Sequence, residues 1–417
     1  MYLFFLYLSF FSSVLNVHAL RMHRFYATTV SGLEDVLKDE VSALRDVTDV
    51  KKTKLGVRFT GTSTTGFDAV INLRSALKVL EELAHADACI STPDDLYVFS
   101  RDAVPWEDVV LDAEFQTLKV EARLGDVGPQ LAHSHFSAVT VQKGICDRLL
   151  EKRGSRPSIS KVDEDMSFLV YLHKDSATLY RSWSGANSLH KRGYRQGAPV
   201  HVAALRETTA SGLLLAAGYN SDGDMGLWVD PMCGSASFGI EAALISCGTA
   251  PGLLRFSSSS KGLPLGLRFA DLDEAAFNEA YETAASRDQR RAKKDLVMLC
   301  SDVSPAALQL ARHGAASAGV DHLLRFECAD VESFKPREKF EALITNPPWD
   351  LRLQDDASLA WSKLGGWFYD NADEGGKLWV LAGNPGLPAN LGLGRPQGFF
   401  AINAANVDMR LLQYVKS

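Results

Sequence analysis

Few cysteines and no excess of positive charge restrict what this chain can be. Its 417 residues include six cysteines, with no CxxC pair and no histidine beside them at the spacing of metal ligands. This scatter argues against a disulfide framework and a zinc site, so no metal is expected. The formal net charge of −7 argues against a surface that binds nucleic acid everywhere, because phosphate contacts need clustered lysine and arginine. A local basic patch is still compatible with this charge.

The first twenty residues lack Lys, Arg, Asp and Glu altogether. This composition predicts a targeting segment over residues 1–21, and Val17-His18-Ala19 resembles a signal-peptidase site, although a positive n-region is missing. A membrane anchor is an alternative, since about 20 apolar residues span a bilayer. Translation that begins at Met22 is a third. Plastid import through an N-terminal signal would follow from the first interpretation, and a cytoplasmic protein from the third.

Residues 25–184 alternate short strands with amphipathic helices, which is typical of an α+β domain. The pattern predicts strands at 25–29, 55–59 and 117–123, helices at 32–44, 67–83 and 135–150, and a hairpin of 168–173 with 177–183. A polar stretch, Ser184-Gly185-Ala186-Asn187, then marks a boundary. We take residues 185–204 as a linker.

Residues 205–417 follow a different pattern. Strands are expected at 227–230, 296–302, 324–329 and 342–345, with helices at 205–217, 238–245 and 305–318 between them. Such alternation predicts an α/β domain with a parallel sheet covered on both faces. Ligands of these sheets bind at the carboxyl ends of the strands, so the residues that follow each strand are the candidates for function.

Three of these strand ends suit a nucleotide-like ligand. The first leads into a Gly- and Ser-rich turn, Asp230 to Ser237, where backbone N–H groups can approach a ligand closely. Asp302 ends the second strand and can accept hydrogen bonds from two ribose hydroxyls, although it could instead cap the next helix, a role also open to Ser304. Asp330 follows the third strand, where it could accept from an adenine amine or be a solvated loop residue.

The fourth strand ends in the most specific motif of the chain, Asn346-Pro347-Pro348-Trp349. Two prolines fix the backbone, so that the Asn346 side-chain oxygen and the Pro347 carbonyl can face one point. An amine bound to both acceptors would turn its lone pair toward a methyl donor, and Trp349 could stack on a flipped base. The motif therefore predicts methyl transfer to an exocyclic amine by positioning, without an activated nucleophile on the protein.

At these residues the chain resembles the THUMP-containing class I methyltransferases, most closely the bacterial guanine-N2 methyltransferases of large-subunit ribosomal RNA (their RlmL-type half). The likeness extends from Phe25 to Ser417, and its close matches include Ser188 to Arg195 and Leu205 to Thr208. It implies a Rossmann-like methyltransferase domain at 205–417, preceded by a ferredoxin-like and THUMP region at 25–184 that docks RNA. It also implies S-adenosylmethionine as the cofactor and ribosomal RNA as the substrate.

The resemblance and the patterns together assign the site residues. The expected cofactor-binding residues are Arg206, Glu207, Thr208, Asp230, Pro231, Met232, Cys233, Gly234, Ser235, Asp302 and Asp330. The expected catalytic residues are Asn346, Pro347, Pro348 and Trp349. RNA contacts are expected from the basic run Lys191, Arg192 and Arg195, because it leads into the catalytic domain. Two further basic groups, at 51–58 and 152–156, suit RNA or a solvated face equally.

The chain departs from the family pattern at three places. Ala236 replaces a third glycine of the cofactor loop, Trp349 replaces the commoner tyrosine, and Asp350-Leu351-Arg352 replaces a Gly-Glu-Arg run. The alternatives that remain open are a tRNA guanine-N2 methyltransferase, an N6-adenine methyltransferase, and a non-catalytic RNA-binding assembly factor. Nothing in the pattern indicates an oligomeric state.

Overall fold

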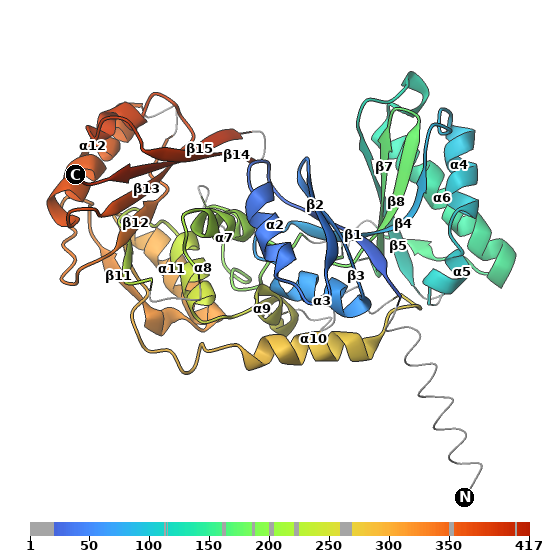
Figure 1. Cartoon of the computed structure of the whole chain (residues 1–417), viewed down its shortest axis with the longest axis horizontal. Coiled ribbons are helices and arrows are strands. Elements are labelled where there is room, and N and C mark those ends of the chain that lie inside the picture. Colours follow the sequence, from blue (N-terminus) through green and yellow to red (C-terminus); the bar gives the residue numbers. More distant parts are fainter. Residues whose placement is uncertain are drawn as a thin grey trace, which may run out of the picture.

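The computed structural model describes residues 21–111, 114, 116–160, 164–185, 188–199, 204–220, 225–258, 269–349, 354–404 and 407–417. Residues 1–20 of the expected targeting segment, residues 186 and 187 of the expected boundary, residues 200–203 of the expected linker, and the Asp350-Leu351-Arg352 departure lie outside these residues. Within the described residues, no helix combines the length and the apolar character that a bilayer crossing requires. Two sheets organise the molecule (Figure 1).

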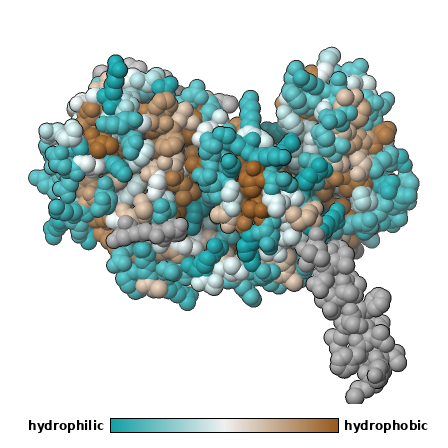
Figure 2. Space-filling model, viewed as in Figure 1, coloured by the Kyte–Doolittle hydropathy of each residue, from teal (hydrophilic) through white to brown (hydrophobic). Residues whose placement is uncertain are grey.

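The first sheet has eight strands in the order β2-β3-β1-β4-β8-β7-β5-β6. Its strands are β1 (His23–Thr28), β2 (Thr48–Thr53), β3 (Gly56–Gly61), β4 (Lys78–Ala86), β5 (Thr117–Leu124), β6 (Ser158–Ile159), β7 (Met166–His173) and β8 (Ser176–Ser182). The helices of this half are α2 (Glu34–Ser42), α3 (Ser63–Asn72), α4 (Pro93–Asp102), α5 (Trp106–Val109) and α6 (Ser134–Arg153), with a 3-10 turn at Pro129–Leu131. Figure 2 shows the surface hollowed between the lobe of β1 to β3 and the lobe of β7 and β8.

Alternation along these strands puts apolar side chains on one face of the sheet. Phe25 and Ala27 of β1 share a buried cluster with Leu37 of α2, and Phe168 of β7 shares another with Ile145 of α6. Because successive strand residues point to opposite faces, the intervening polar residues lie on the face away from these helices.

The predicted helix over 67–83 is wrong in its second half, because α3 ends at Asn72 and β4 begins at Lys78. The Glu40 carboxylate of α2 accepts hydrogen bonds from the backbone N–H groups of Arg74 (2.7 Å) and Ser75 (3.0 Å). These two groups are thereby held in a loop, and β4 then pairs with β1 and β8. Strand pairing overrides the apolar spacing that indicated a helix. The sequence pattern also missed β2, α4 and α5.

The second sheet has seven strands in the order β11-β10-β9-β12-β13-β15-β14. Its strands are β9 (Trp228–Asp230), β10 (Met298–Asp302), β11 (Leu324–Cys328), β12 (Ala342–Thr345), β13 (Lys377–Ala382), β14 (Gly398–Ala404) and β15 (Val407–Val415). The helices are α7 (Glu207–Ala216), α8 (Ser237–Ser246), α11 (Pro305–Ala318) and α12 (Gln354–Asn371), with 3-10 turns at Asp321–Leu323 and Pro388–Leu391. β9 to β13 run parallel, whereas β15 is antiparallel to both of its neighbours. The strand order reverses beside β9, so that a ligand crevice is expected there.

A segment of the second half packs against the first. Helices α9 (Pro251–Ser258) and α10 (Glu274–Ser286) cover α3, and the rings of Phe67 and Phe277 meet at 5.5 Å. Just before α10, Asp271 accepts a hydrogen bond of 2.5 Å from the buried Arg181 guanidinium, which also binds Glu81 at 2.6 Å. Removal of either partner of such a buried pair leaves a charge without its partner, so this contact ties the two halves together.

A second contact between the halves depends on Gly32. Ser31 forms an antiparallel β-bridge with Asn403 of β14, and the adjacent Gly32 has φ +96° with no room for a side chain. A Cβ there would lie 1.9 Å from the carbonyl oxygen of Ala401. Only glycine therefore allows the loop after β1 to approach β14 this closely.

Gly32→Ala should reduce the free energy of unfolding by about 2–4 kcal/mol, because backbone strain and a backbone clash act together. Gly218→Ala is the matched control: Gly218 has φ +88° but open space around it, so only the left-handed conformation should cost, about 1 kcal/mol. Urea unfolding of both variants measures the difference. Equal losses would show that the close approach to β14 does not contribute to stability.

Candidate active site

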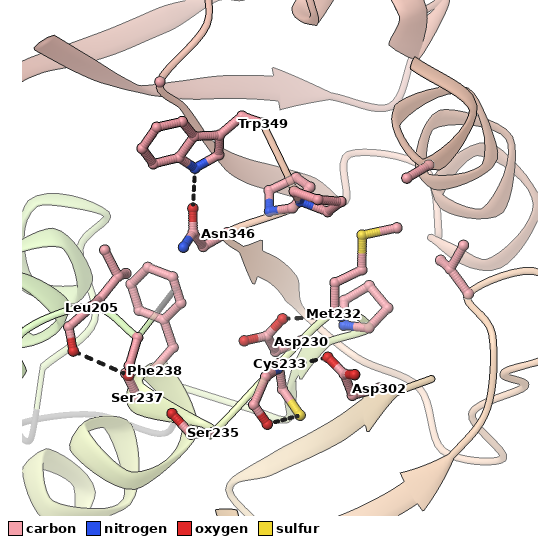
Figure 3. Close-up of a pocket in the computed structure, with 18 of the residues that line it drawn as sticks. Leu205, Asp230, Met232, Cys233, Ser235, Ser237, Phe238, Asp302, Asn346 and Trp349 are labelled. Atoms are coloured by element: carbon pink, nitrogen blue, oxygen red, sulfur yellow. Dashed lines mark hydrogen bonds between the residues drawn. The ribbon is translucent and has the colours of Figure 1, made fainter. Parts of the chain in front are cut away.

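A cavity of about 1240 Å³ lies at the carboxyl ends of the parallel strands. Each of the five parallel strands contributes a lining residue at its end or just after it. In the order β9 to β13, these residues are Asp230, Asp302, Asp330, Asn346 and Gly383. Figure 3 shows the loop after β9 facing the loop after β12 across this space. The crevice therefore lies where the reversal of strand order predicts it.

The loop after β9 forms the floor of the cavity. Asp230 is 2% exposed, and burial raises the pKa of its carboxyl to about 7. The Cys233 N–H donates to the carbonyl of Ser301 at 2.9 Å, and Gly234 has φ +54°. Ala236 has φ +56°, so the alanine that replaces a glycine adopts the left-handed conformation that glycine favours. The loop path survives this substitution at the cost of local backbone strain.

Asp302 is held by backbone donors from two loops. Its carboxylate accepts from the Gly234 N–H at 2.8 Å and from the Ser304 N–H at 2.8 Å. Ser304 is the residue that caps α11, because its hydroxyl accepts from the Ala307 N–H at 3.2 Å. The alternative role of Asp302 as helix cap is thus filled by Ser304, and the Asp302 carboxylate borders the cavity (Figure 3).

Asp330 is ion-paired, and its side chain is 44% exposed, so it can be a solvated loop residue or accept from a ligand. Lys363 of α12 lies 3.3 Å from its carboxylate and 2.9 Å from that of Glu332. Hydrogen bonding to Glu332 and Asp330 raises the pKa of Lys363, which therefore stays cationic. Lys363 lines the cavity, and sequence reasoning missed it because helix α12 was not predicted.

The motif after β12 is braced by two indole groups. The Trp349 Nε1–H donates to the Asn346 side-chain oxygen at 3.0 Å, and the Trp361 Nε1–H donates to the Pro348 carbonyl at 2.9 Å. The Trp349 ring also covers Gly383, where an added Cβ would lie 2.7 Å from a ring atom. The first of these bonds, drawn in Figure 3, fixes which end of the Asn346 amide is the oxygen.

Most of the predicted site residues meet at this cavity. Those that line it are Arg206, Asp230, Pro231, Met232, Cys233, Gly234, Ser235, Asp302, Asp330, Asn346, Pro347, Pro348 and Trp349. Glu207 and Thr208 are buried beside it without lining it, and Thr209 lines it in their place. Asn384 and Pro385, in the loop after β13, were also missed, although the rule that strand ends carry the site could have found them.

The basic linker run does not form the expected RNA-facing group. Arg192 is 1% exposed; its guanidinium donates to the carbonyls of Leu189 (3.0 Å) and Arg74 (2.7 Å). Arg195 binds the Ser237 hydroxyl at 2.6 Å and pairs with Glu207 at 3.6 Å. The structure contradicts the prediction for Arg192, because the positive charge of this linker is used inside the protein. Lys191 is exposed.

Two buried hydroxyls of the cavity wall suit a polar ligand. Ser235 Oγ and Thr209 Oγ1 are buried and make no hydrogen bond within the part of the chain that the structure describes. Both residues line the cavity. Since buried polar groups are nearly always hydrogen-bonded, a polar molecule bound in the cavity would supply the partner that each hydroxyl lacks.

Comparisons with known proteins agree with this architecture. Residues 24–80 match the RlmL ferredoxin-like domain, residues 94–181 the THUMP domain, and residues 192–389 the methyltransferase domain described as RMKL-like. The ribosomal RNA large subunit methyltransferase K/L of Syntrophotalea carbinolica is 33% identical over 398 residues, which are 94% of this chain and 53% of that protein. The chain thus spans about half the length of the curated relatives it matches.

Solved structures share the fold over nearly the whole chain. SMU.472, crystallised with SAH, has a TM-score of 0.79 and 21% identity, with 95% of this chain and 99% of that chain covered. A protein of Listeria monocytogenes, described as a predicted N6-adenine-specific DNA methylase, has a TM-score of 0.79 and 24% identity, with 97% and 98% covered. Three domain matches in this order, together with the shared fold, show that the chain combines a ferredoxin-like domain, a THUMP domain and an RMKL-like methyltransferase domain.

Proposed function

We propose that the protein transfers a methyl group from S-adenosylmethionine to the exocyclic N2 amine of a guanine in large-subunit ribosomal RNA. The observation that carries the proposal is that the Asn346 motif faces the Asp230–Ser235 loop and Asp302 across one cavity. The cavity exceeds the usual upper size of small-molecule sites, about 1000 Å³, so it has room for a cofactor and a nucleoside together.

The residues of the cavity fit this cofactor. Asp302 can accept from the ribose hydroxyls and Asp330 from the adenine amine, while the hydroxyls of Ser235 and Thr209 still need polar partners. The buried Asp230 carboxyl can hold a cationic group when ionised. When bound, S-adenosylmethionine supplies an electrophilic methyl group on a sulfonium.

The Asn346 motif can orient the target amine. A carbonyl oxygen has two lone pairs, so Asn346 can accept from the amine while it still accepts from Trp349. The Trp361 bond to Pro348 holds the rigid Pro-Pro backbone in place. The neutral amine is already a nucleophile, so the protein only has to align it with the methyl group. After the transfer, the extra proton on the nitrogen passes to solvent. Positioning of this kind can account for a large share of a rate enhancement.

The alternatives differ in substrate or in the loss of catalysis. A tRNA guanine-N2 methyltransferase would use the same domains, and an N6-adenine methyltransferase the same amine geometry. The ferredoxin-like and THUMP domains at 24–181 favour RNA over DNA. A non-catalytic assembly factor has no need of the braced Asn346 amide or of unpartnered hydroxyls in the cavity wall. The Syntrophotalea relative acts on large-subunit ribosomal RNA by its name, and this supports that substrate.

Purified protein with labelled cofactor and separate ribosomal and transfer RNA pools would test the proposal, with nucleoside mass spectrometry to identify the product. N2-methylguanosine in large-subunit RNA is the expected result. Methylation of tRNA alone would move the substrate to the first alternative. No product in either pool would favour the assembly factor.

Asn346→Ala should lower the methylation rate about 100-fold or more, because the acceptor that aligns the amine is lost. Cofactor affinity, measured by titration calorimetry, should stay near that of the wild type. Asn346→Asp keeps an acceptor oxygen and should retain part of the rate. An Asn346→Ala variant that methylates at the parental rate would overturn the role given to this residue.

Trp349→Phe should lower kcat about tenfold with little change in KM, because the ring for stacking remains while the donor that orients Asn346 is lost. Trp379→Phe is the matched control. The Trp379 indole N–H is buried and makes no hydrogen bond among the described residues, so its removal should leave kcat unchanged. Similar kcat values for the two variants would exclude an orienting role for the Trp349 N–H.

Cofactor affinity should increase as the pH rises through about 7, because the buried Asp230 carboxyl has its pKa raised to about 7 and only its ionised form attracts a cationic ligand. The raised pKa also means that the folded protein holds this proton more tightly than the unfolded chain does. The protonated carboxyl therefore stabilises the fold at acidic pH, and this contribution is lost as the pH rises through about 7. Calorimetric titration between mildly acidic and mildly alkaline pH measures the affinity. Asp230→Asn should abolish this pH dependence, and a variant with an unchanged profile would assign it to another group.

A further inference from the structure

We propose that the open face of the first sheet is an RNA-binding platform that leads a single-stranded or looped segment to the rim of the cavity. This inference rests on the proposed function for its choice of RNA as the ligand. The open face is the one turned away from α2, α3 and α6. Its exposed residues include Arg24 of β1, Lys51 of β2, Arg58 of β3, His85 of β4, Arg123 of β5, and Tyr171 and His173 of β7.

Strand register places these residues on one surface. Tyr26 pairs directly with Arg58, and Arg58 with Lys51, across β1, β3 and β2. At the other end of the sheet, Tyr171 pairs directly with Arg123 across β7 and β5. Directly opposed residues of neighbouring strands project from the same face. One row thus contains Tyr26 with Arg58 and Lys51, and the other contains Tyr171 with Arg123.

The helix side of the same strands is closed. Its residues, such as Phe25, Val57 and Phe168, belong to buried clusters with helix residues. By contrast, the side chain of Arg24 is 68% exposed and Tyr171 is 40% exposed. Between the two ends of the face, the rings of Tyr26 and Tyr180 lie 6.3 Å apart.

The charge of this face is opposite to that of the whole chain. Its carboxylates Glu82 and Glu121 are neutralised by ion pairs, at 2.8 Å to Arg24 and at 3.3 Å to Lys119. Arg58 and Arg123 are exposed, and neither forms an ion pair with any other residue that the structure describes. Cations free to meet phosphates on a protein of net charge −7 mark a local anion-binding surface.

The aromatic side chains favour unpaired nucleotides over a duplex. Tyr171 and His173 lie near the end of β7 with their rings nearly parallel, at 7° between the ring planes. Exposed rings interleaved with arginine on a sheet are the means by which proteins stack splayed RNA bases. A regular duplex hides its bases, so such rings would gain little from it.

The face is joined to the cavity by a short stretch of chain. Thr28 ends β1, and three residues further Ser31 forms its bridge to Asn403, so the separation is about 10 Å at most. The next residue, Ala404, lines the cavity. RNA that follows β1 toward its carboxyl end therefore arrives at the cavity rim.

A double variant, Arg58→Gln with Arg123→Gln, tests the electrostatic part of the proposal. The probe is a fluorescein-labelled RNA hairpin with guanines in its loop, followed by fluorescence anisotropy at several salt concentrations. We expect the Kd to weaken about tenfold or more and the salt slope to fall by about 1.4, the value for two phosphate contacts on single-stranded RNA. Lys335→Gln with Arg337→Gln removes two exposed charges from the loop between β11 and β12 and should leave both quantities unchanged.

Tyr171→Ala tests the stacking part. Affinity for the hairpin should fall at least about fivefold without a change in salt slope, while affinity for a fully paired duplex should not change. Thermal melting confirms that each variant is folded. If the Arg58 and Arg123 variant binds like its control, or Tyr171→Ala binds like the wild type, the platform is wrong.

Methylation assays separate this proposal from the proposed function. With an active enzyme, the platform variants should raise KM for RNA and leave kcat at saturating RNA unchanged, because none of these residues touches the cavity. Binding is measured without chemistry, so an inactive wild-type protein would count against the proposed function and leave the binding result intact. A loss of kcat with unchanged Kd would contradict the platform.

Discussion

The hydrogen bond from the Gly234 N–H to the Asp302 carboxylate, 2.8 Å long, is the constraint on which the cavity depends. It joins the loops that follow β9 and β10, two adjacent strands whose parallel register brings their carboxyl ends side by side. Gly234 can direct its N–H there because it adopts a positive φ. Backbone geometry thus sets the floor of the site, and the carboxylate that faces the cavity cannot rotate freely.

The same reasoning extends to the contact between the two halves. Burial alone would raise the pKa of Glu81, yet Arg181 and His23 outweigh it and lower that pKa to about 2. Glu81 is therefore ionised at neutral pH, and Arg181 can bind it and Asp271 at once. Because Asp271 belongs to the segment that precedes α10, this buried network fixes the first sheet relative to the catalytic domain. A rigid relation of this kind is what a binding surface outside the cavity needs if it is to present a nucleotide to the motif.

The sequence allowed much of the catalytic half to be predicted, because parallel strands there are short, apolar and followed by motif residues. The predicted strand at 342–345 and helix at 305–318 have the bounds found in the structure. In the first half the apolar spacing of residues 67–83 indicated one helix, and no local signal reveals that Glu40, far away in sequence, holds the backbone at Arg74 and Ser75. Lys363 and Arg192 show the same limit at the site. One belongs to a helix that was not predicted, and the other has a basic neighbourhood in sequence but a buried position in space.

The two departures that the structure describes show what the fold requires of its site. Ala236 takes the φ of a glycine, so the loop is held by its hydrogen bonds to Ser301 and Asp302 more firmly than by local preference. Trp349 keeps an aromatic ring over Gly383 and adds an indole N–H that reaches Asn346. A phenyl ring carries no donor, and a phenol carries its only donor on the hydroxyl at the far end of the ring, so the bond to the Asn346 amide depends on the indole of Trp349. The orientation of the Asn346 amide is therefore set by a residue at which this chain departs from the family pattern.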